Sequence, residues 1–477
     1  MKKRMALLLA IILVALVFVG CAQDAGEAAE VAPEAGESNE AGDVTTDVLV
    51  IGGGGAGLVS GITAAENGSD VILVEKMPML GGNTLISATG FTASDTVLHE
   101  EAGVPFTVED HIERTMTEGK DLPNLELVTL LAEESSSATD WLLSLGLSYE
   151  VRVDEPWWIV PTEGHFGSQM IAAYREEAAK HSNFDARVNS KATELVVEDG
   201  KVVGAMVEDT DGNEYTIKAN SVILATGGFG NAPELIGEYN PKYAGGTGVM
   251  STAGPTGDGF RMAVAVGADV VDMEHNMMRP LATPGYWIRE TVISEEGIGG
   301  ILVNKGAVRF TDETQHRWDM VPDVAAQEDG IAFVIFDQDV ADTSNGQAAI
   351  KNAHSRMVEA DTIEALAAEL EMDAEILQTT VDAYNNGEDE FGRETMGKVK
   401  TAPFYGFQVE PSSHYTMGGV AINRDAEVLD TDGNPIPGLY AVSEVTGGLY
   451  GAGRVAGNNT LENVVFGKIA GANAAGK

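Results

Sequence analysis

Cysteine is almost absent from this sequence: its 477 residues include a single one, Cys21. One thiol excludes disulfide bonds within the chain. It also excludes iron–sulfur clusters, thiolate zinc sites and c-type haem attachment built by this chain alone. The histidines supply no pair at a convincing metal-ligand spacing. The sequence therefore predicts no metal site.

Basic residues are also scarce, with 29 Lys and Arg against 74 Asp and Glu and a formal net charge of −45. A chain of this charge repels nucleic acid and anionic membrane surfaces, so neither is a predicted partner. A solvated surface explains most of the acidity, and a cationic redox partner is an open alternative.

The apolar run near the start, Met5 to Val19, has 15 residues, follows three basic residues and is too short to span a bilayer comfortably. It ends at Gly20-Cys21, and residues 1–21 resemble a bacterial lipoprotein signal peptide in which Cys21 becomes the lipidated first residue. A plain signal peptide or a membrane anchor is the alternative. Either interpretation predicts an extracytoplasmic location, and the first predicts a lipid anchor to the cell membrane, at the cell surface or in the periplasm.

Residues 22–44 are predicted to be a disordered acidic tether. Between Ala22 and Asp43 the chain carries seven acids and no base, with Val31 as the one bulky apolar residue. Such a composition cannot bury a core.

The stretch from Asp47 to Gly57 predicts a buried strand, a glycine turn and a helix. Its glycines fit the G-x-G-x-x-G spacing of a dinucleotide-binding turn as Gly52, Gly54 and Gly57. A second predicted strand, residues 70–74, leads into Glu75, an acid placed to bind ribose hydroxyls. The helix start offers N–H groups to phosphates. A purely structural strand–turn–helix is the alternative.

Further glycine turns follow later in the chain. Gly81-Gly82-Asn83-Thr84 comes after Glu75, Thr226-Gly227-Gly228 ends an apolar strand, and Thr256 to Gly259 opens a helix. A small antiparallel meander is predicted between residues 195 and 217. From about Glu274 the sequence becomes rich in aromatic and charged residues. The pattern of residues 362–384 predicts a pair of helices, with Asp373 as a cap between them.

These pieces together resemble the soluble fumarate reductase family of flavoproteins, whose relatives include urocanate and other enoate reductases. The resemblance runs from about Thr45 to the C-terminus. Besides the motifs above it rests on Gly300 to Asn304, Arg309-Phe310, His414 to Gly419, Pro437 to Tyr440, Glu444 to Gly448, and Gly451 to Asn458.

The resemblance implies an α/β fold in which a discontinuous Rossmann-like FAD-binding domain, residues 45–273 and 415–477, carries an inserted α+β capping domain, residues 274–414. It also implies non-covalent FAD between the two. Carried over by motif, the residues expected to line FAD are Gly52, Gly54, Ala56, Gly57, Glu75, Lys76, Gly82, Asn83, Thr84, Thr226, Gly227, Asp258, Glu444 and Asn458.

The family reaction is reduction of an activated C=C bond, with hydride from flavin N5 and a proton from an arginine of the capping domain. Arg317, eight residues after Arg309-Phe310, matches that acid. Because the pKa of arginine exceeds about 12, this role rests on the resemblance and not on pKa tuning. The alternative is a surface arginine beside Asp312 and Glu313.

His414 and Arg454 match the group that binds the substrate carboxylate. The arginine fork fits a carboxylate with two hydrogen bonds, and holding it there stabilises an enolate-like transition state. A structural ion pair for Arg454 and a packed histidine for His414 are the alternatives.

The chain departs from the family's fumarate enzymes at three places. Arg279-Pro280 stands where they have His-Pro, and Tyr415 stands for a second histidine. Their Thr-Glu proton relay is missing from the aligned stretch 292–296, where Glu295 or Glu296 is either a substitute relay or a solvated surface acid.

We therefore expect a monocarboxylate with an aromatic or bulky tail, similar to urocanate or a cinnamate, and not fumarate. Trp157, Trp158, Tyr286 and Trp287 supply aromatic surface near segments that border the family's pocket. Arg279 keeps the alternative open, because it could bind a second anionic group of a dicarboxylate.

The chain has no haem motif and no second nucleotide fingerprint, so its electrons are expected from a separate donor protein, cytochrome or FMN-bearing, or from a diffusible carrier. The prediction is an anaerobic terminal reductase. The alternatives are a dehydrogenase that runs the reaction backwards and a flavin-binding lipoprotein without turnover.

Overall fold

The computed structural model describes residues 44–87, 90–243, 251–283, 286–288, 290–294, 299–387, 390–393 and 397–476. All of them belong to one compact unit, residues 41–477. Cys21, residues 22–43 of the predicted tether and the two acids Glu295 and Glu296 lie outside the described residues, whereas Val44, the last residue of that predicted tether, begins a strand. Among the helices of the described part, none is both long and apolar enough to cross a bilayer.

A mostly parallel sheet forms the centre of the larger lobe. Strand β1 (Val44–Ile51) pairs in parallel with β2 (Val71–Val74) on one side and with β9 (Glu214–Leu224) on the other. The last four residues of β1 are all buried, as expected of a strand covered on both faces. The sheet order is β18-β19-β9-β1-β2-β6, with the meander β7 and β8 attached to β9. The bounds are β6 (Phe184–Arg187), β7 (Lys191–Glu198), β8 (Lys201–Glu208), β18 (Glu427–Leu429) and β19 (Pro435–Ala441).

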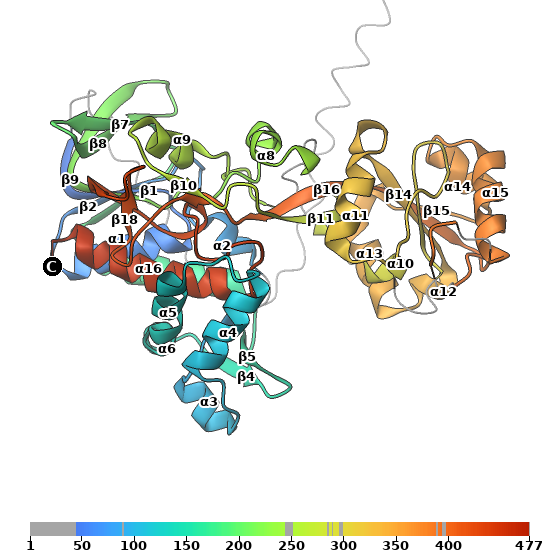
Figure 1. The fold of residues 1–477 in the computed structure, drawn as a ribbon, viewed down its shortest axis with the longest axis horizontal. Coiled ribbons are helices and arrows are strands. Elements are labelled where there is room, and N and C mark those ends of the chain that lie inside the picture. Colours follow the sequence, from blue (N-terminus) through green and yellow to red (C-terminus); the bar gives the residue numbers. More distant parts are fainter. Residues whose placement is uncertain are drawn as a thin grey trace, which may run out of the picture. The chain divides into compact units, whose positions relative to one another are not determined.

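The C-terminal part of the chain completes this lobe. Strand β19 lies in parallel beside β9, and helix α16 (Asn458–Ala474) packs along α1 (Gly55–Glu66) (Figure 1). The two helices approach closely because α16 has glycines at the crossing. A Cβ at Gly471 would lie 2.4 Å from the backbone oxygen of Ser60. The discontinuous Rossmann-like fold predicted from the sequence is thus confirmed.

Helices and a three-stranded sheet cover the rest of this lobe. Asn124 and the Thr107–Asp110 capping box begin two of the helices, as their side chains accept bonds from first-turn N–H groups. The elements are α2 (Gly82–Ile86), β3 (Phe91–Thr92), α3 (Val97–Ala102), α4 (Val108–Glu118), α5 (Leu125–Glu133), α6 (Ser135–Ser144), β4 (Tyr149–Arg152), β5 (Glu155–Pro161), α7 (Phe166–Ala178), α8 (Pro233–Tyr239), α9 (Asp258–Ala265), β10 (Val270–Val271) and β17 (Gly419–Val420).

A second, antiparallel sheet is built from the middle of the chain and has its own apolar clusters. Its order is β12-β11-β16-β14-β13, with β15 also on β16. Asp373 caps α15 by accepting from the N–H groups of Glu375 and Ile376, both at 3.0 Å, which confirms the predicted helical pair. The elements are β11 (Asn276–Thr283), β12 (Tyr286–Trp287), α10 (Thr291–Ser294), β13 (Ile301–Val303), α11 (Arg317–Ala325), β14 (Ala332–Asp337), α12 (Gln338–Ala341), α13 (Ser344–Ala353), β15 (Val358–Ala360), α14 (Ile363–Glu369), α15 (Ala374–Asn385) and β16 (Phe404–Thr416).

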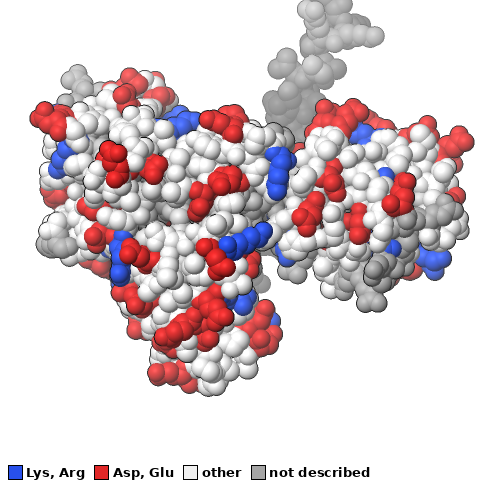
Figure 2. All heavy atoms as spheres, viewed as in Figure 1, with Lys and Arg blue, Asp and Glu red and all other residues white. Residues whose placement is uncertain are grey.

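Acidic side chains are spread over the visible surface, while basic ones form isolated spots (Figure 2). This face therefore carries a net negative charge, as the formal net charge of −45 leads one to expect.

Candidate active site

The glycine turn after β1 has two glycines that packing requires and one that faces open space. A Cβ at Gly52, whose φ is +111°, would lie 2.3 Å from the backbone oxygen of Ala225. A Cβ at Gly57 would lie 1.9 Å from the backbone oxygen of Gly52, so Gly57 serves helix–strand packing. At Gly54 a Cβ would meet no protein atom within 4 Å. The turn therefore leaves room for a ligand at Gly54.

Gly54 opens into a cavity with about 1050 Å³ of empty space including its mouth. Most residues predicted to line FAD do line this cavity. They are Gly52, Gly54, Ala56, Glu75, Lys76, Gly82, Asn83, Thr84, Thr226, Gly227, Asp258 and Glu444. Residues that the sequence did not single out contribute as well, among them Met77, Thr252, Ser443, Asn459, Thr460 and Asn463.

Acidic side chains form hydrogen bonds and an ion pair with other residues of the cavity wall. Glu75 accepts from the N–H of Gly53 at 2.7 Å and from that of Met77 at 2.8 Å, so it also fixes the glycine turn. Lys76 pairs with Asp258 at 2.7 Å. Burial disfavours the ionised form of Asp258, but the hydrogen bond and charge of Lys76 outweigh it, and the pKa of Asp258 lies below its ordinary value.

Asn458 and Gly57 are the two predicted FAD residues that do not line the cavity. The Asn458 amide is fully buried, where its oxygen accepts from His111 Nε2 at 3.0 Å and its nitrogen donates to Thr115 at 2.9 Å. The next residue, Asn459, lines the cavity instead and accepts from Arg454 Nη1 at 2.6 Å. In the sequence, the two neighbouring amides Asn458 and Asn459 at the start of α16 indicate a cofactor residue at this place. The sequence does not tell which of the two faces the cavity.

Three arginines and a histidine gather beside this cavity, and we call them the cationic cluster. Arg279 comes from β11, His414 from β16, Arg454 from the loop before α16, and Arg317 from the first position of α11. Tyr415, the neighbour of His414, lines the cavity itself.

Electrostatics within the cationic cluster favour an anionic ligand. Burial, together with the charges of Arg317 and Arg454, lowers the pKa of Arg279 to about 10, while Glu290 acts in the opposite direction. Burial and the charges of Arg279 and Arg454 lower the pKa of His414 to about 3, so this imidazole is neutral at physiological pH. A carboxylate would offset the mutual repulsion of these groups. Glu290 is an acid near the site that the sequence interpretation did not single out.

Arg454 is held by neutral partners. Its Nη1 donates to Asn459 and, at 3.1 Å, to the backbone oxygen of Val455, and its guanidinium lies 4.6 Å from the centre of the Tyr415 ring. Its Nε is buried with no hydrogen-bond partner within the described part of the chain. Arg454 thus retains hydrogen-bonding capacity for an anion.

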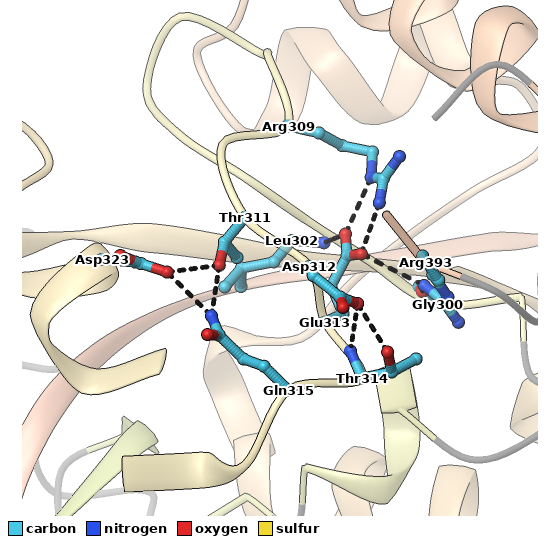
Figure 3. Close-up of polar contacts among 10 residues, drawn as sticks. All are labelled: Gly300, Leu302, Arg309, Thr311, Asp312, Glu313, Thr314, Gln315, Asp323 and Arg393. Atoms are coloured by element: carbon cyan, nitrogen blue, oxygen red, sulfur yellow. Dashed lines mark hydrogen bonds and ion pairs between the residues drawn. The ribbon is translucent and has the colours of Figure 1, made fainter. Parts of the chain in front are cut away.

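The loop that leads to Arg317 is fixed by its own polar contacts, which are buried at Glu313 and exposed at Asp312 (Figure 3). The Glu313 carboxylate accepts from Arg309 and from the N–H of Leu302, and Arg393 lies 3.3 Å from it. Asp312 accepts from Thr314, at 2.8 Å from its N–H and 2.6 Å from its hydroxyl.

The same loop is joined to α11 by a second set of contacts (Figure 3). Gln315 donates to Asp323 at 2.7 Å, and Asp323 also accepts from Thr311 at 2.5 Å. Asp312 and Glu313 are therefore engaged elsewhere, and among the described ion pairs neither is a partner of the half-buried Arg317.

The aromatic residues proposed to border the substrate have other neighbours in the structure. Arg114 stacks over Trp157 at 4.1 Å, and the buried Trp158 lies where a Cβ at Gly457 would come within 2.6 Å of it. The side chains of Tyr286 and Trp287 lie outside the described residues.

The cavity fits a dinucleotide. Thr226 lines it with a buried hydroxyl that has no partner among the described residues, and Gly54 leaves its backbone open to a phosphate beside the start of α1. The buried Glu444 carboxylate, whose pKa burial raises, accepts from the N–H of Thr416 at 3.0 Å at the same wall.

A family model described as "FAD binding domain" matches residues 47–460. A probable fumarate reductase of Shewanella frigidimarina is 39% identical over an alignment of 449 residues that covers 90% of this chain and 75% of the relative. Urocanate reductase of Eggerthella lenta is 33% identical over 459 residues, covering 90% of this chain and 74% of the relative. The solved open conformation of a flavocytochrome c3 fumarate reductase matches with a TM-score of 0.85 at 37% identity, covering 91% of this chain and 78% of that one.

The fold, the cavity lined by the predicted FAD residues and these likenesses agree with one another. The chain belongs to the soluble fumarate reductase family of flavoproteins and is an FAD-dependent oxidoreductase that acts on carbon–carbon double bonds.

Proposed function

We propose that the protein reduces the activated C=C bond of an α,β-unsaturated carboxylate. The observation that carries the proposal is the cationic cluster beside the FAD cavity, where Arg279, Arg454 and a neutral His414 come together near Arg317. When bound, FAD supplies the hydride for one alkene carbon.

Arg454 and His414 bind the substrate carboxylate in this proposal. Arg454 offers guanidinium N–H groups, and the neutral imidazole of His414 offers one further donor. As the C=C bond is reduced, negative charge grows on the carboxylate oxygens. Donors already in place stabilise this charge without reorganisation.

Arg317 gives a proton to the carbon next to the carboxylate. An arginine can act as the acid because the forming carbanion is far more basic than a guanidine and because the site excludes water. The polar contacts of Glu313 and Asp323 keep the start of α11 in place, which supports Arg317 as a group of fixed position.

The identity of the second end of the substrate depends on Arg279. The aromatic ring of a cinnamate offers no hydrogen-bond acceptor to Arg279, whereas the imidazole nitrogen of urocanate or a second carboxylate offers one. A urocanate-like acid therefore stays our first candidate. A fumarate-like dicarboxylate is the second, and the closeness of Arg279 to Arg317 and Arg454 favours it.

A substrate panel tests both the proposed reaction class and the choice of substrate. The FAD-loaded protein is reduced with dithionite without oxygen and mixed with urocanate, fumarate, cinnamate, acrylate and the methyl esters of these acids. We expect the yellow colour to return with at least one free acid and not with its ester. Fast reoxidation by fumarate with slow aryl acrylates would select the dicarboxylate. No reoxidation by any acid would favour a flavin-binding protein without turnover.

The electron donor and the direction of the reaction belong to the same proposal. We expect a separate cytochrome or FMN-bearing protein, or a diffusible carrier, to feed a terminal reductase in anaerobic respiration. In a dehydrogenase, electrons would pass from the saturated acid to an artificial acceptor faster than they pass from the reduced flavin to the enoate. Comparing these two rates with one dye couple separates the directions.

The extracytoplasmic lipid anchor is proposed from the signal-like residues 1–21. Replacing the lipid attachment residue, Cys21→Ser, should move the protein from the membrane fraction to the soluble extracytoplasmic fraction. An unchanged distribution of the variant would contradict the lipid anchor.

A further inference from the structure

Behind Arg454 lies a buried acid that the proposed chemistry does not use. Glu462, early in α16, is 2% exposed. Its Oε2 accepts hydrogen bonds from the hydroxyl of Tyr450 at 2.8 Å and from that of Tyr415 at 3.2 Å. The two rings meet edge to face with their centroids 5.9 Å apart. The acid is thus enclosed and held by two phenols.

Tyr415 connects Glu462 with both parts of the active site. Its ring lies beneath the guanidinium of Arg454, and it lines the FAD cavity. The hydrogen bonds of Arg454 within the described chain go to neutral groups, namely Asn459, Val455 and, at 4.0 Å, the sulfur of Met277. The carboxylate of Glu462, which lies at the hydroxyl end of the Tyr415 ring, therefore supplies negative charge close to Arg454 without bonding to it in the described chain.

Four charged or titratable groups face Glu462. They are Tyr415 from β16, Tyr450 and Arg454 from the loop before α16, and Glu444 from the 3-10 turn Ser443–Val445. Burial raises the pKa of Glu462 to about 7. The bonds from the tyrosines and the charge of Arg454 oppose the rise, and the charge of Glu444 adds to it. Both protonation states of Glu462 are therefore populated near neutral pH.

We propose that Glu462 is a positioning residue that balances the charge of Arg454 through Tyr415, and that it takes up a proton when a carboxylate binds to Arg454. The inference rests on the proposed function. A bound carboxylate neutralises Arg454 and removes the attraction that favours ionised Glu462. Linkage requires the reverse effect by the same factor, so a protonated Glu462 strengthens carboxylate binding. The proton comes from solvent, and no covalent bond of the ligand changes.

Calorimetric titration of the oxidised FAD-loaded protein tests this coupling. Fumarate and urocanate serve as probes, and no electron donor is present, so neither is turned over. Titrations in buffers of different protonation enthalpy give the number of protons taken up. For the wild type we expect a fraction of a proton at pH 7 and a Kd that rises about fivefold from pH 6 to pH 8, near the low end of typical coupling factors.

Two variants locate the proton. Glu462→Gln keeps an acceptor for both tyrosines but cannot titrate, so its binding should show no proton uptake and a constant Kd over this range. Glu462→Asp keeps a carboxylate and should take up the proton again. His414→Gln controls for the other titratable group near Arg454. Loss of uptake in His414→Gln, with uptake intact in Glu462→Gln, would overturn the inference.

A measurement on the wild type alone keeps the inference falsifiable if the variants fold poorly. Infrared difference spectra on adding a probe should gain the carbonyl band of a protonated carboxylic acid. Carboxylate binding without this band and without proton uptake would refute the inference and leave the proposed function standing. Failure of both acids to bind would contradict the proposed function, and the inference with it.

Discussion

Arg309 donates to Glu313 from Nε at 2.9 Å and from Nη2 at 2.6 Å, and Arg393, far along the chain, contacts the same carboxylate at 3.3 Å. All three side chains are buried. A carboxylate between two guanidinium groups is fully engaged, and it joins the loop before α11 to strand β13 through the N–H of Leu302.

Removal of the Glu313 charge should therefore destabilise the protein strongly. In Glu313→Gln two buried arginines lose the negative charge of Glu313, and breaking a buried ion pair in this way costs about 3–5 kcal/mol. Urea unfolding monitored by fluorescence measures the loss. Asp312→Asn is the matched control, because the hydrogen bonds of the Asp312 carboxylate within the described part of the chain are local ones from Thr314, and it should cost about 1 kcal/mol or less. Equal losses in both variants would contradict the central role of Glu313.

Arg317→Ala should abolish enoate reduction and leave FAD bound. The proposed proton transfer contributes about 10²–10⁴-fold to the rate, so kcat should fall by that factor. Flavin absorbance after gel filtration checks that the cofactor content is unchanged. Arg424→Ala, at an exposed arginine outside the cationic cluster, should keep the wild-type rate. A rate loss in Arg317→Ala below tenfold would exclude Arg317 as the acid.

Two glycine variants separate cofactor binding from folding. A methyl at Gly54 meets no protein atom, so Gly54→Ala should fold normally but weaken FAD binding at least tenfold, because the methyl occupies the space of a phosphate. At Gly57 the methyl would lie 1.9 Å from the oxygen of Gly52, so Gly57→Ala should lower the melting temperature of the apoprotein. Fluorescence titration with FAD and thermal melts distinguish the two outcomes.

Acidification should destabilise the fold through buried histidines. Burial lowers the pKa of His111 to about 4, although its bond to Asn458 acts in the other direction. The unfolded chain binds this proton below about pH 6.5. The folded protein binds it only near pH 4, so stability falls as the pH drops through this window, by on the order of 3 kcal/mol. His414 acts in the same direction.

The contribution of Glu462 to stability changes with pH in the opposite direction to that of the histidines. Its folded pKa is raised to about 7, so its contribution to stability is lost as the pH rises toward 7. Urea unfolding between pH 4.5 and 7.5 measures the sum of these effects. In His111→Gln stability should fall less on acidification than in the wild type, and in Glu462→Gln it should fall more, because the opposing contribution of Glu462 is gone. An acid-side slope in His111→Gln equal to that of the wild type would contradict the assignment for His111.

The sequence predicts the nucleotide part of the site well because its chemistry is local. The strand–turn–helix–strand unit brings Glu75 next to the turn from Gly52 to Gly57. This unit can be recognised from residue spacing alone. The cavity residues confirm the fold and FAD family, while the roles of individual residues, Arg317 above all, stay predictions.

What the sequence does not reveal are contacts between segments that are far apart. No local pattern pairs Glu313 with Arg393, and none places Glu462 behind Tyr415. The same limit explains the choice between Asn458 and Asn459. Both amides are on the first turn of α16, and only the packing of His111 and Thr115 decides which one is buried.

The pairing of strand β16 restricts where chains of this family can gain or lose residues. Its first half pairs with β14 and its second half with β11, and near its end His414 and Tyr415 follow one another. Since neighbouring side chains of a strand point to opposite faces, a one-residue deletion just upstream would exchange the ligand-binding position with the one above Glu462. Homologous chains should therefore tolerate substitutions along this strand far better than any insertion or deletion within it.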